Sequence, residues 1–219
     1  MDLHQTLALA VNRPDGDPGW RSLGLLHAAA VVGRFDAVGV AARLASEHQV
    51  ERAAIDEAAL QVVAYGGFPR ALEALTVVAH ELGQPPQGSA DEARSPEQLS
   101  ADGRRTWDAI YAGNAERVLA QLDGLLPGLD RLVLESAYAR ILSRPGLALG
   151  WRELLGVAAL ALAGLPRPLE SHARGAIHNG FSPSQVQDML LTCMPLADAH
   201  ARSVIESAVA RLSRKVDPK

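Results

Sequence analysis

The feature that most constrains the fold is the near absence of strand patterning in a chain rich in helix-forming residues. No stretch shows a clear alternation of β-branched or aromatic residues between turn residues, which is the pattern of a half-buried strand. Hydrophobic residues make up 48% of the chain and aromatic residues only 4%, so the core must be built mainly from Ala, Leu and Val. Ala and Leu favour helices, and the sequence therefore predicts an all-α protein.

Turn and cap residues divide this helical pattern into segments. Gly180 follows His178 and Asn179 where a C-capping glycine is expected, and Ser182-Pro183 has the form of a helix start. The chain has 219 residues, enough for one large domain or two small ones. The predicted helices cover residues 3–11, 20–32, 36–47, 51–64, 68–82, 96–111, 114–123, 128–142, 151–163, 168–179, 183–192 and 196–214.

The charge and the cysteine content narrow the class of protein. The formal net charge is −4, whereas nucleic acids and anionic membranes are bound by basic faces. Cys193 is the only cysteine, which excludes an intrachain disulfide. The first twelve residues lack the basic region and cleavage site of a signal peptide, and the most apolar run, Leu154 to Leu165, is too short to cross a bilayer. We therefore expect a cytoplasmic protein with no nucleic-acid or membrane partner.

A polar segment rich in Gly and Pro, “GQPPQGSADEARSP” at residues 83–96, interrupts the helical pattern. It predicts a division of the chain into three parts. These are an N-terminal helical unit at 1–83, a linker at 84–96 and a C-terminal helical unit at 97–219.

The two helical units resemble each other in sequence. The segments “WRSLGLLHAA” at 20–29 and “WRELLGVAAL” at 151–160 share Trp, Arg, Leu and Ala at an offset of 131 positions. Such self-similarity indicates duplication of a helical unit.

Two titratable residues stand out in the second unit. Glu153 opens a helix that is apolar on nearly every side, and His172 follows 19 residues later on the next predicted helix. The short “AGLPRP” loop between them predicts antiparallel helices. Glu153 and His172 are therefore expected near the same groove between these helices.

The stretch “ESAYARILSRPGLALGWRELLGVAALALAGLPRPLESHARGAIHNGFSPSQVQDML” resembles the carboxymuconolactone decarboxylase family, which shares its all-helical fold with the alkyl hydroperoxidase D proteins. “GRRTWDAIYAG” at 103–113 resembles the lead-in to a family unit, and “YGGFPRALEAL” at 65–75 resembles its closing segment. The resemblance implies two related multi-helix units of the alkyl hydroperoxidase D-like type, the first of them degenerate. The matching residues are Tyr138, Arg144-Pro145, Arg152-Glu153-Leu154, His172, Ala176 and Asn179-Gly180.

The hydroperoxidase branch of this family has a Glu, a C-x-x-C pair and a His. Counted from Glu153, the cysteine positions fall on Leu165 and Pro168, and the histidine position falls on His172. Thiol peroxidase chemistry needs a thiolate and usually a resolving thiol, which Leu and Pro cannot supply. Cys193 lies a helix away with no neighbouring thiol in the sequence. The sequence therefore argues against disulfide-based peroxidase activity.

What remains resembles the decarboxylase branch without the cysteine pair. It implies a lyase that acts on a small carboxylated lactone or related acid, with no metal and no cofactor. In this hypothesis His172 is the proton donor, and Glu153 orients it and raises its pKa. Arg152, Arg174 and Arg144 are the candidates for holding the substrate carboxylate.

Two further expectations concern the first unit and the assembly. At the offset of 131, Ser22 replaces Glu153 and Ala41 replaces His172, but the closing segment that contains Tyr65 is kept. One site can then combine Glu and His from the second unit with walls from the first. The family resemblance also implies ring formation, and we expect a homotrimer, with a dimer or hexamer as the alternatives.

A non-catalytic alternative stays open at this stage. A histidine near a helix join is commonly a packing or capping residue, so the chain can also be a helical oligomer that binds a small acid or a protein. A pocket at His172 with Glu153 and an Arg pointing inward favours the enzyme. A pocket filled by Leu and Ala favours the binding protein.

Overall fold

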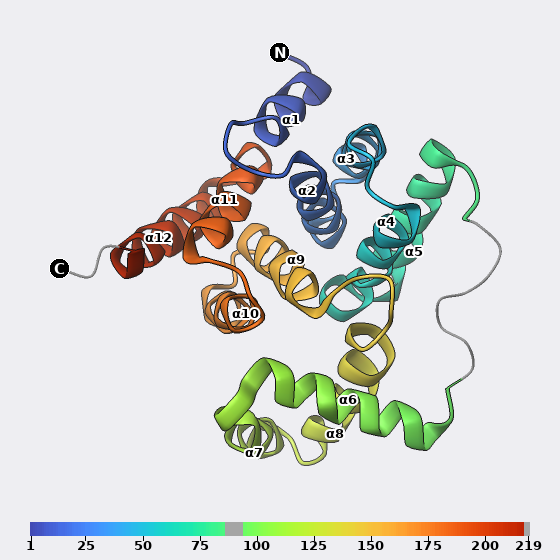
Figure 1. The fold of residues 1–219 in the computed structure, drawn as a ribbon, viewed down its shortest axis with the longest axis vertical. Coiled ribbons are helices and arrows are strands. Elements are labelled where there is room, and N and C mark those ends of the chain that lie inside the picture. The colour runs from blue at the N-terminus through green and yellow to red at the C-terminus, as the bar shows by residue number, and fades with distance from the viewer. Residues whose placement is uncertain (86–93, 217–219) are drawn as a thin grey trace.

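The computed structural model describes residues 1–85 and 94–216, and this part of the chain is all-α, as predicted (Figure 1). None of the described residues lies in a β-strand. Most of the predicted linker at 84–96 falls on residues 86–93, which lie outside the described residues. The elements are α1 (Leu3–Val11), α2 (Pro18–Val32), α3 (Phe35–Glu47), α4 (Arg52–Leu60), α5 (Val62–Leu82), α6 (Pro96–Tyr111), η1 (Ala112–Asn114), α7 (Ala115–Leu125), α8 (Leu129–Val133), η2 (Leu134–Leu142), α9 (Leu149–Leu162), α10 (Pro166–His178), α11 (Pro183–Cys193), η3 (Met194–Leu196) and α12 (Ala199–Val216).

Two of the helices are irregular. The predicted helix at 128–142 divides into α8 and η2, and η2 is a π-helix, with the Ser143 N–H donating to the Tyr138 carbonyl five residues earlier. Inside α5 the backbone leaves the helical conformation at Gly67 (φ 79°, ψ 171°), two residues before Pro69. A left-handed φ of this kind favours glycine, and the sequence predicts a break between helices at this point.

Local sequence explains where several helices begin. Asp2, Ser95 and Ser182 cap α1, α6 and α11, and in each case the glutamine three residues later completes a capping box. Proline occupies the first turn of α2, α6, α10 and α11, where its missing N–H costs no helical hydrogen bond.

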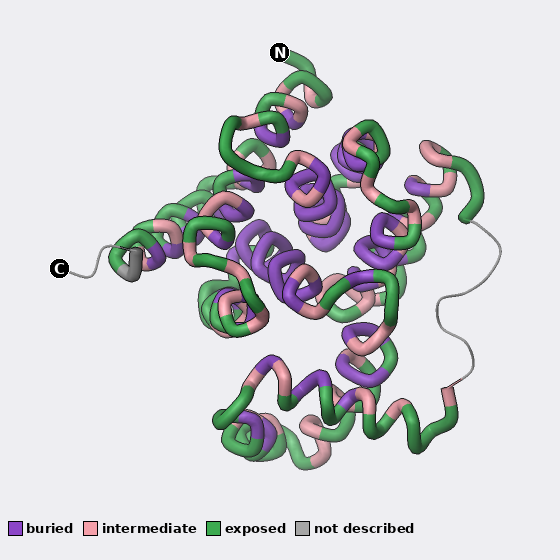
Figure 2. The backbone as a smooth tube through the Cα atoms, in the orientation of Figure 1, coloured by how far each residue is buried: buried purple, intermediate pink, exposed green. Residues whose placement is uncertain are grey.

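Helices α2 and α9 lie side by side at the centre of the fold, and both are buried along most of their length (Figures 1 and 2). Helices α3 and α5 pack against α2, whereas α10, α11 and α12 pack against α9. Trp20 of α2 stacks on Trp151 of α9, with ring centroids 3.6 Å apart and an interplanar angle of 9°. The centre of the molecule is therefore a contact between the two sequence units.

Ion pairs made by a buried arginine join each central helix to the other unit. Arg21 of α2 places Nε 2.8 Å from Oδ2 of Asp188 on α11. Arg152 of α9 places Nη2 2.9 Å from Oε2 of Glu57 on α4. Both arginines are buried, and both also donate to backbone carbonyls in the loop before their own helix.

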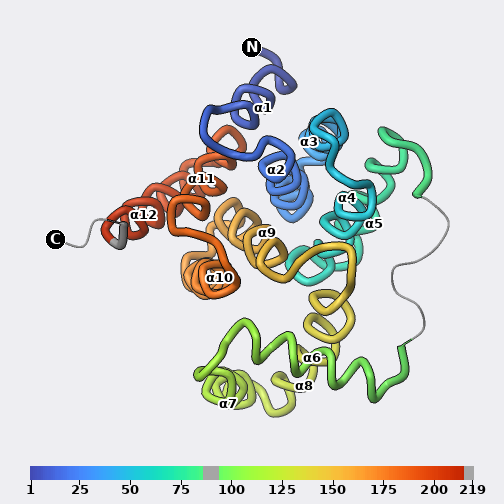
Figure 3. Tube along the Cα trace, viewed as in Figure 1, coloured from blue at the N-terminus to red at the C-terminus, as the bar shows by residue number. Residues whose placement is uncertain are grey.

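The segment from α6 to η2 lies to one side of this centre, next to α10 (Figure 3). It has a small hydrophobic cluster of its own, which consists of Trp107, Ile110, Ala115, Leu119, Tyr138 and Leu142. Contacts of α6 with α10, and of η2 with α5, join this layer to the rest of the chain. The side chains of α6 and η2 thus come close to the predicted site on α9 and α10.

Among the described helices, α5 is long and apolar enough to cross a membrane by length and composition alone. Its backbone is interrupted at Gly67, so it is not one continuous helix. The interruption argues against a straight membrane span.

Candidate active site

The structure brings Glu153 and His172 together, as the sequence predicts. Oε2 of Glu153 lies 3.1 Å from Nδ1 of His172 across the α9–α10 contact. The Glu153 side chain is fully buried and that of His172 is 14% exposed. A Cβ atom at Gly175 would collide with the Glu153 carboxylate, so glycine on α10 gives this carboxylate its space.

Tyr65 of α5 reaches this pair from the first unit. Its ring centroid lies 5.5 Å from that of His172, at an interplanar angle of 61°. A Cβ atom at Gly156 would lie only 2.5 Å from the Tyr65 hydroxyl oxygen and 3.1 Å from Nδ1 of His172. The absence of a side chain at 156 therefore lets the tyrosine hydroxyl and the imidazole meet over α9.

Three buried polar atoms in this region have no hydrogen-bond partner among the described residues. They are Oε1 of Glu153, the hydroxyl of Tyr65 and Nε2 of His27. His27 packs edge-on against the other side of the Tyr65 ring, with centroids 5.3 Å apart. Buried polar atoms are normally satisfied, so unpartnered ones close together indicate a place where a ligand or water completes the bonding.

The two histidines beside Tyr65 are in opposite electrostatic environments. Burial by itself lowers the pKa of His172, but the charge of Glu153 and its hydrogen bond together raise that pKa above its ordinary value. Burial lowers the pKa of His27 to about 4, against the opposing hydrogen bond with the Ala58 carbonyl at Nδ1. At neutral pH His27 is therefore uncharged, whereas His172 holds a proton more readily than a free histidine.

Two further tyrosines, from α6 and η2, lie close enough to Glu153 for its charge to act on them. Tyr138 of η2 donates a hydrogen bond to the hydroxyl of Tyr111 on α6, at 3.1 Å. Burial raises the pKa of Tyr111, the bond with Tyr138 opposes this, and the negative charge of Glu153 adds to it. Tyr138 is among the residues that carry the family resemblance. Nothing in the spacing of Tyr111 predicts its place near Glu153, because that place depends on how α6 packs.

The three predicted arginines are in two different places. Arg152 and Arg144 both pair with Glu57, with Nη2 atoms 2.9 Å from its two carboxylate oxygens. The Glu57 carboxylate of α4 thus neutralises Arg152 and Arg144, which the sequence hypothesis assigns to binding the substrate carboxylate. Arg174 instead lines a cavity of about 230 Å³ between α10 and the α6–α7 turn.

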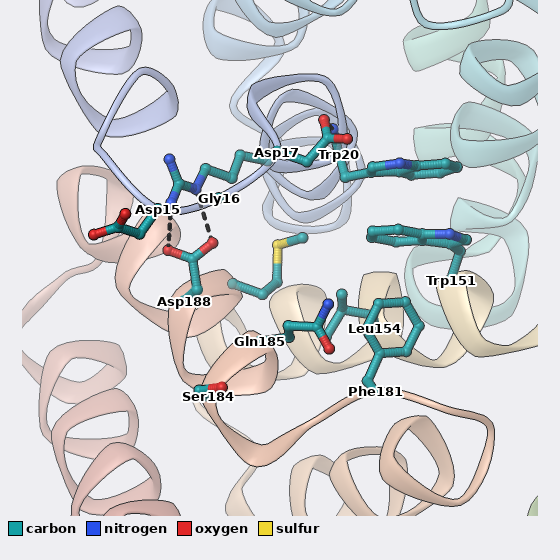
Figure 4. Close-up of a pocket in the computed structure, with 12 residues that line it drawn as sticks. Asp15, Gly16, Asp17, Trp20, Trp151, Leu154, Phe181, Ser184, Gln185 and Asp188 are labelled. Atoms are coloured by element: carbon teal, nitrogen blue, oxygen red, sulfur yellow. Dashed lines mark hydrogen bonds and ion pairs between the residues drawn. The ribbon is translucent and has the colours of Figure 1, made fainter.

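A second cavity, of about 180 Å³, lies beside the ends of α2 and α9 (Figure 4). Trp20, Trp151 and Phe181 form its aromatic wall, and Asp188 lies opposite. Arg21 also lines the cavity and donates to both carboxylate oxygens of Asp188. Three aspartates and one arginine line this cavity, so its charge does not suit an acidic ligand.

Neither thiolate chemistry nor a metal cluster is supported by the described residues. Cys193 is fully buried, and burial raises the pKa of its thiol to about 12. No group of three or more His, Cys, Asp or Glu side chains among the described residues is arranged to hold a metal ion.

Comparison with known families identifies a domain in this part of the chain. Residues 127–210 match the model of the carboxymuconolactone decarboxylase family. The match includes Glu153, His172 and Tyr138 and leaves Tyr65 and Tyr111 outside. A search of curated proteins found no match. The family domain supports a carboxymuconolactone decarboxylase-like or alkyl hydroperoxidase D-like protein.

Proposed function

We propose that this carboxymuconolactone decarboxylase-like chain is an enzyme that transfers a proton to a small carboxylated lactone or related acid after loss of CO₂. The observation that carries the proposal is the buried Glu153–His172 pair, 3.1 Å apart, with a free carboxylate oxygen and a free tyrosine hydroxyl beside it. The reaction requires a positioned acid and stabilisation of negative charge, and these side chains can supply both.

The proposed step has a simple balance of atoms and electrons. The bond between the substrate carbon and its carboxylate breaks, CO₂ leaves, and the electron pair remains on a dienolate conjugated with the lactone carbonyl. Protonated His172 delivers a proton to the carbon, and water returns a proton to the imidazole. Glu153 is the positioning residue, because its carboxylate fixes the ring and favours the imidazolium. These reaction steps need neither a metal nor a redox cofactor.

Tyr65 has a separate part in the proposal. Its hydroxyl is buried and unpartnered among the described residues, and it lies over Gly156 beside His172. A preorganised donor of this kind stabilises developing negative charge without reorganising during the reaction. We assign the Tyr65 hydroxyl to the dienolate oxygen, which would make the site a joint product of both sequence units.

The non-catalytic alternative receives less support. A binding protein with a degenerate site would fill the space at His172 with Leu and Ala. The neighbours of His172 are instead Glu153 and Tyr65, with Tyr111 close by. Of the predicted arginines, Arg152 and Arg144 pair with Glu57, and Arg174 lines the cavity beside α10. Unsatisfied buried polar atoms destabilise a fold, and they are easiest to explain at a functional site.

The proposal includes an origin by duplication. Each of four successive helices in the first unit begins 131 positions before a helix of the second unit. The constant offset through four helices and their loops supports duplication over chance similarity between Ala- and Leu-rich helices. In this register α6, α7 and α8 belong to neither repeat. The helix starts are Leu3, Pro18, Phe35 and Arg52 in the first unit, and Leu134, Leu149, Pro166 and Pro183 in the second.

We further propose that the protein works in the cytoplasm as a homotrimer. Several large apolar side chains stay exposed on the single chain, among them Leu9, Phe68, Leu72, Leu125 and Leu126. Cyclic association would remove such surface from water. Light scattering should give a mass close to three times the 23.2 kDa chain, and a purely monomeric species would contradict the trimer.

The test of function is a comparison of variants on a panel of carboxylated lactones, with CO₂ release and deuterium incorporation from D₂O as the two readouts. We expect His172→Ala to lower turnover by roughly 10²–10⁴-fold, because the general acid is removed. Tyr65→Phe should lower kcat by roughly 10²–10³-fold with little change in KM, since a transition-state donor is lost. A folded His172→Ala protein with full turnover would remove this residue from the mechanism.

A further inference from the structure

The cavity between α10 and the α6–α7 turn has a basic lining in a chain whose formal net charge is −4. Its charged or titratable lining residues are Arg117 of α7, Arg174 and His178 of α10, and Tyr111 of α6. No Asp or Glu lines it, although acidic residues outnumber Lys and Arg in the chain as a whole. An anion in this cavity would meet cationic or hydrogen-bonding groups on both walls.

The two arginines are not neutralised by the protein. Neither Arg117 nor Arg174 forms an ion pair with an acidic side chain in the part of the chain that the structure describes. Arg117 donates a hydrogen bond to the amide oxygen of Asn114, and the adjacent Glu116 forms an ion pair with Arg104. This contrasts with Arg152, whose charge Glu57 neutralises. Two guanidinium groups without an acidic partner among the described residues, on facing walls, suit a carboxylate, which accepts paired hydrogen bonds.

The cavity is also next to the proposed catalytic pair. Ser171 and Arg174 line it from α10, on either side of His172 in the sequence. Tyr111 lines it as well, and the negative charge of Glu153 reaches the Tyr111 hydroxyl strongly enough to contribute to its raised pKa. A small molecule with its acid group between the arginines could therefore extend past Tyr111 toward His172.

We propose that this cavity is the carboxylate-binding subsite of the enzyme, with Arg117 and Arg174 as the groups that determine specificity for an acidic substrate. The inference rests on the proposed function and adds a residue, Arg117, that lies outside the matched family domain. It gives α6 and α7, which lie outside the repeated register, a role in substrate selection.

The experiment is calorimetric titration of the full-length protein with γ-butyrolactone-γ-carboxylate, and with neutral γ-butyrolactone as the matched probe without charge. The carboxylate should bind measurably more tightly than the neutral lactone. Arg117→Gln and Arg174→Gln should each weaken carboxylate binding by roughly 10- to 100-fold, as expected for the loss of a charged hydrogen bond. Arg202→Gln removes an equal charge from α12, away from the cavity, and should leave binding unchanged.

The outcomes separate this site from the chemistry. Equal binding of the two lactones, no binding of the acid by the unaltered protein, or unchanged affinity in both cavity variants would each overturn the subsite. His172→Ala should retain carboxylate binding within a fewfold while losing turnover. If it binds normally and also turns over normally, the proposed function fails and the subsite stands.

Discussion

The helix pairs α2–α3 and α9–α10 occupy equivalent places in the sequence register but have opposite chemical character. In the first pair, the Ser22 hydroxyl donates a hydrogen bond to the Pro18 carbonyl of its own helix, and Ala41 is fully buried. In the second, Glu153 and His172 stand at those two positions and leave a carboxylate oxygen unsatisfied. The comparison teaches that the same two helix positions can hold either inert core residues or a reactive pair, because other residues provide the packing of the central helices.

The largest expected effect on the free energy of unfolding concerns the ion pairs that join the two units. Glu57 is 6% exposed and holds Arg152 and Arg144, whereas Asp188 is 28% exposed and holds Arg21 and Arg13. Removing one partner of a buried pair costs about 3–5 kcal/mol, because the remaining charge is left without compensation. We expect Glu57→Gln to lower the free energy of unfolding by about this amount, and Asp188→Asn by clearly less.

Denaturant unfolding of the two variants checks this difference. If Asp188→Asn lowered the free energy of unfolding as much as Glu57→Gln, the expected difference would be wrong. Solvent access to the carboxylate would then not decide the loss of stability. Arg34, which pairs with Asp36 on the surface, offers a control in Arg34→Gln. That exposed pair should contribute at most about 1 kcal/mol.

The next effect concerns pH, where His27 of the first unit and His172 of the second should act in opposite directions. The pKa of His27 is lowered to about 4, so the unfolded chain binds more protons there between pH 6.5 and 4. Stability should therefore fall as the pH drops through this window, by about 3 kcal/mol from this residue. The pKa of His172 is raised, so its stabilising contribution is complete below pH 6.5 and is lost as the pH rises through its folded pKa.

Unfolding free energies measured across pH separate the two histidines. His27→Gln keeps a donor for the Ala58 carbonyl and should flatten the acid side of the profile. His172→Gln should flatten the neutral-to-alkaline side. An acid side that keeps its full slope in His27→Gln would show that another group controls it.

The smallest effect is expected at Cys193. Its thiol is buried in the core around α9 and α11, with its pKa raised to about 12, so it is not a nucleophile near neutral pH. Cys193→Ala should leave turnover unchanged and lower stability by about 1 kcal/mol through loss of buried volume. Loss of turnover in a folded Cys193→Ala protein would favour thiol chemistry instead.

The sequence predicts the helices well because their signals are local. Hydrophobic spacing, caps such as Ser182 and breakers such as Gly67 act within a few residues of one another. The contact between Glu153 and His172 was also predictable, since it joins two consecutive helices through a short loop.

The rest of the site depends on contacts that local signals do not specify. Arg152 has the sequence context of a substrate-binding residue, but a carboxylate 95 positions away on α4 pairs with it. Arg117 and Tyr111 approach α10 only because the α6–α7 layer folds against it. The π-helical turn of η2 has no pattern in the sequence that distinguishes it from an ordinary helix.

The stacked indoles of Trp20 and Trp151 have a spectroscopic consequence. At a centroid separation of 3.6 Å, the electronic transitions of the two rings couple and should produce an exciton couplet in circular dichroism. Trp107, the third tryptophan, lies in the α6–η2 cluster against Tyr111 and Tyr138, apart from the stacked pair. The couplet would vanish when α2 and α9 separate, even if every helix stayed intact. The protein thus contains an intrinsic optical probe of the seam between its two units.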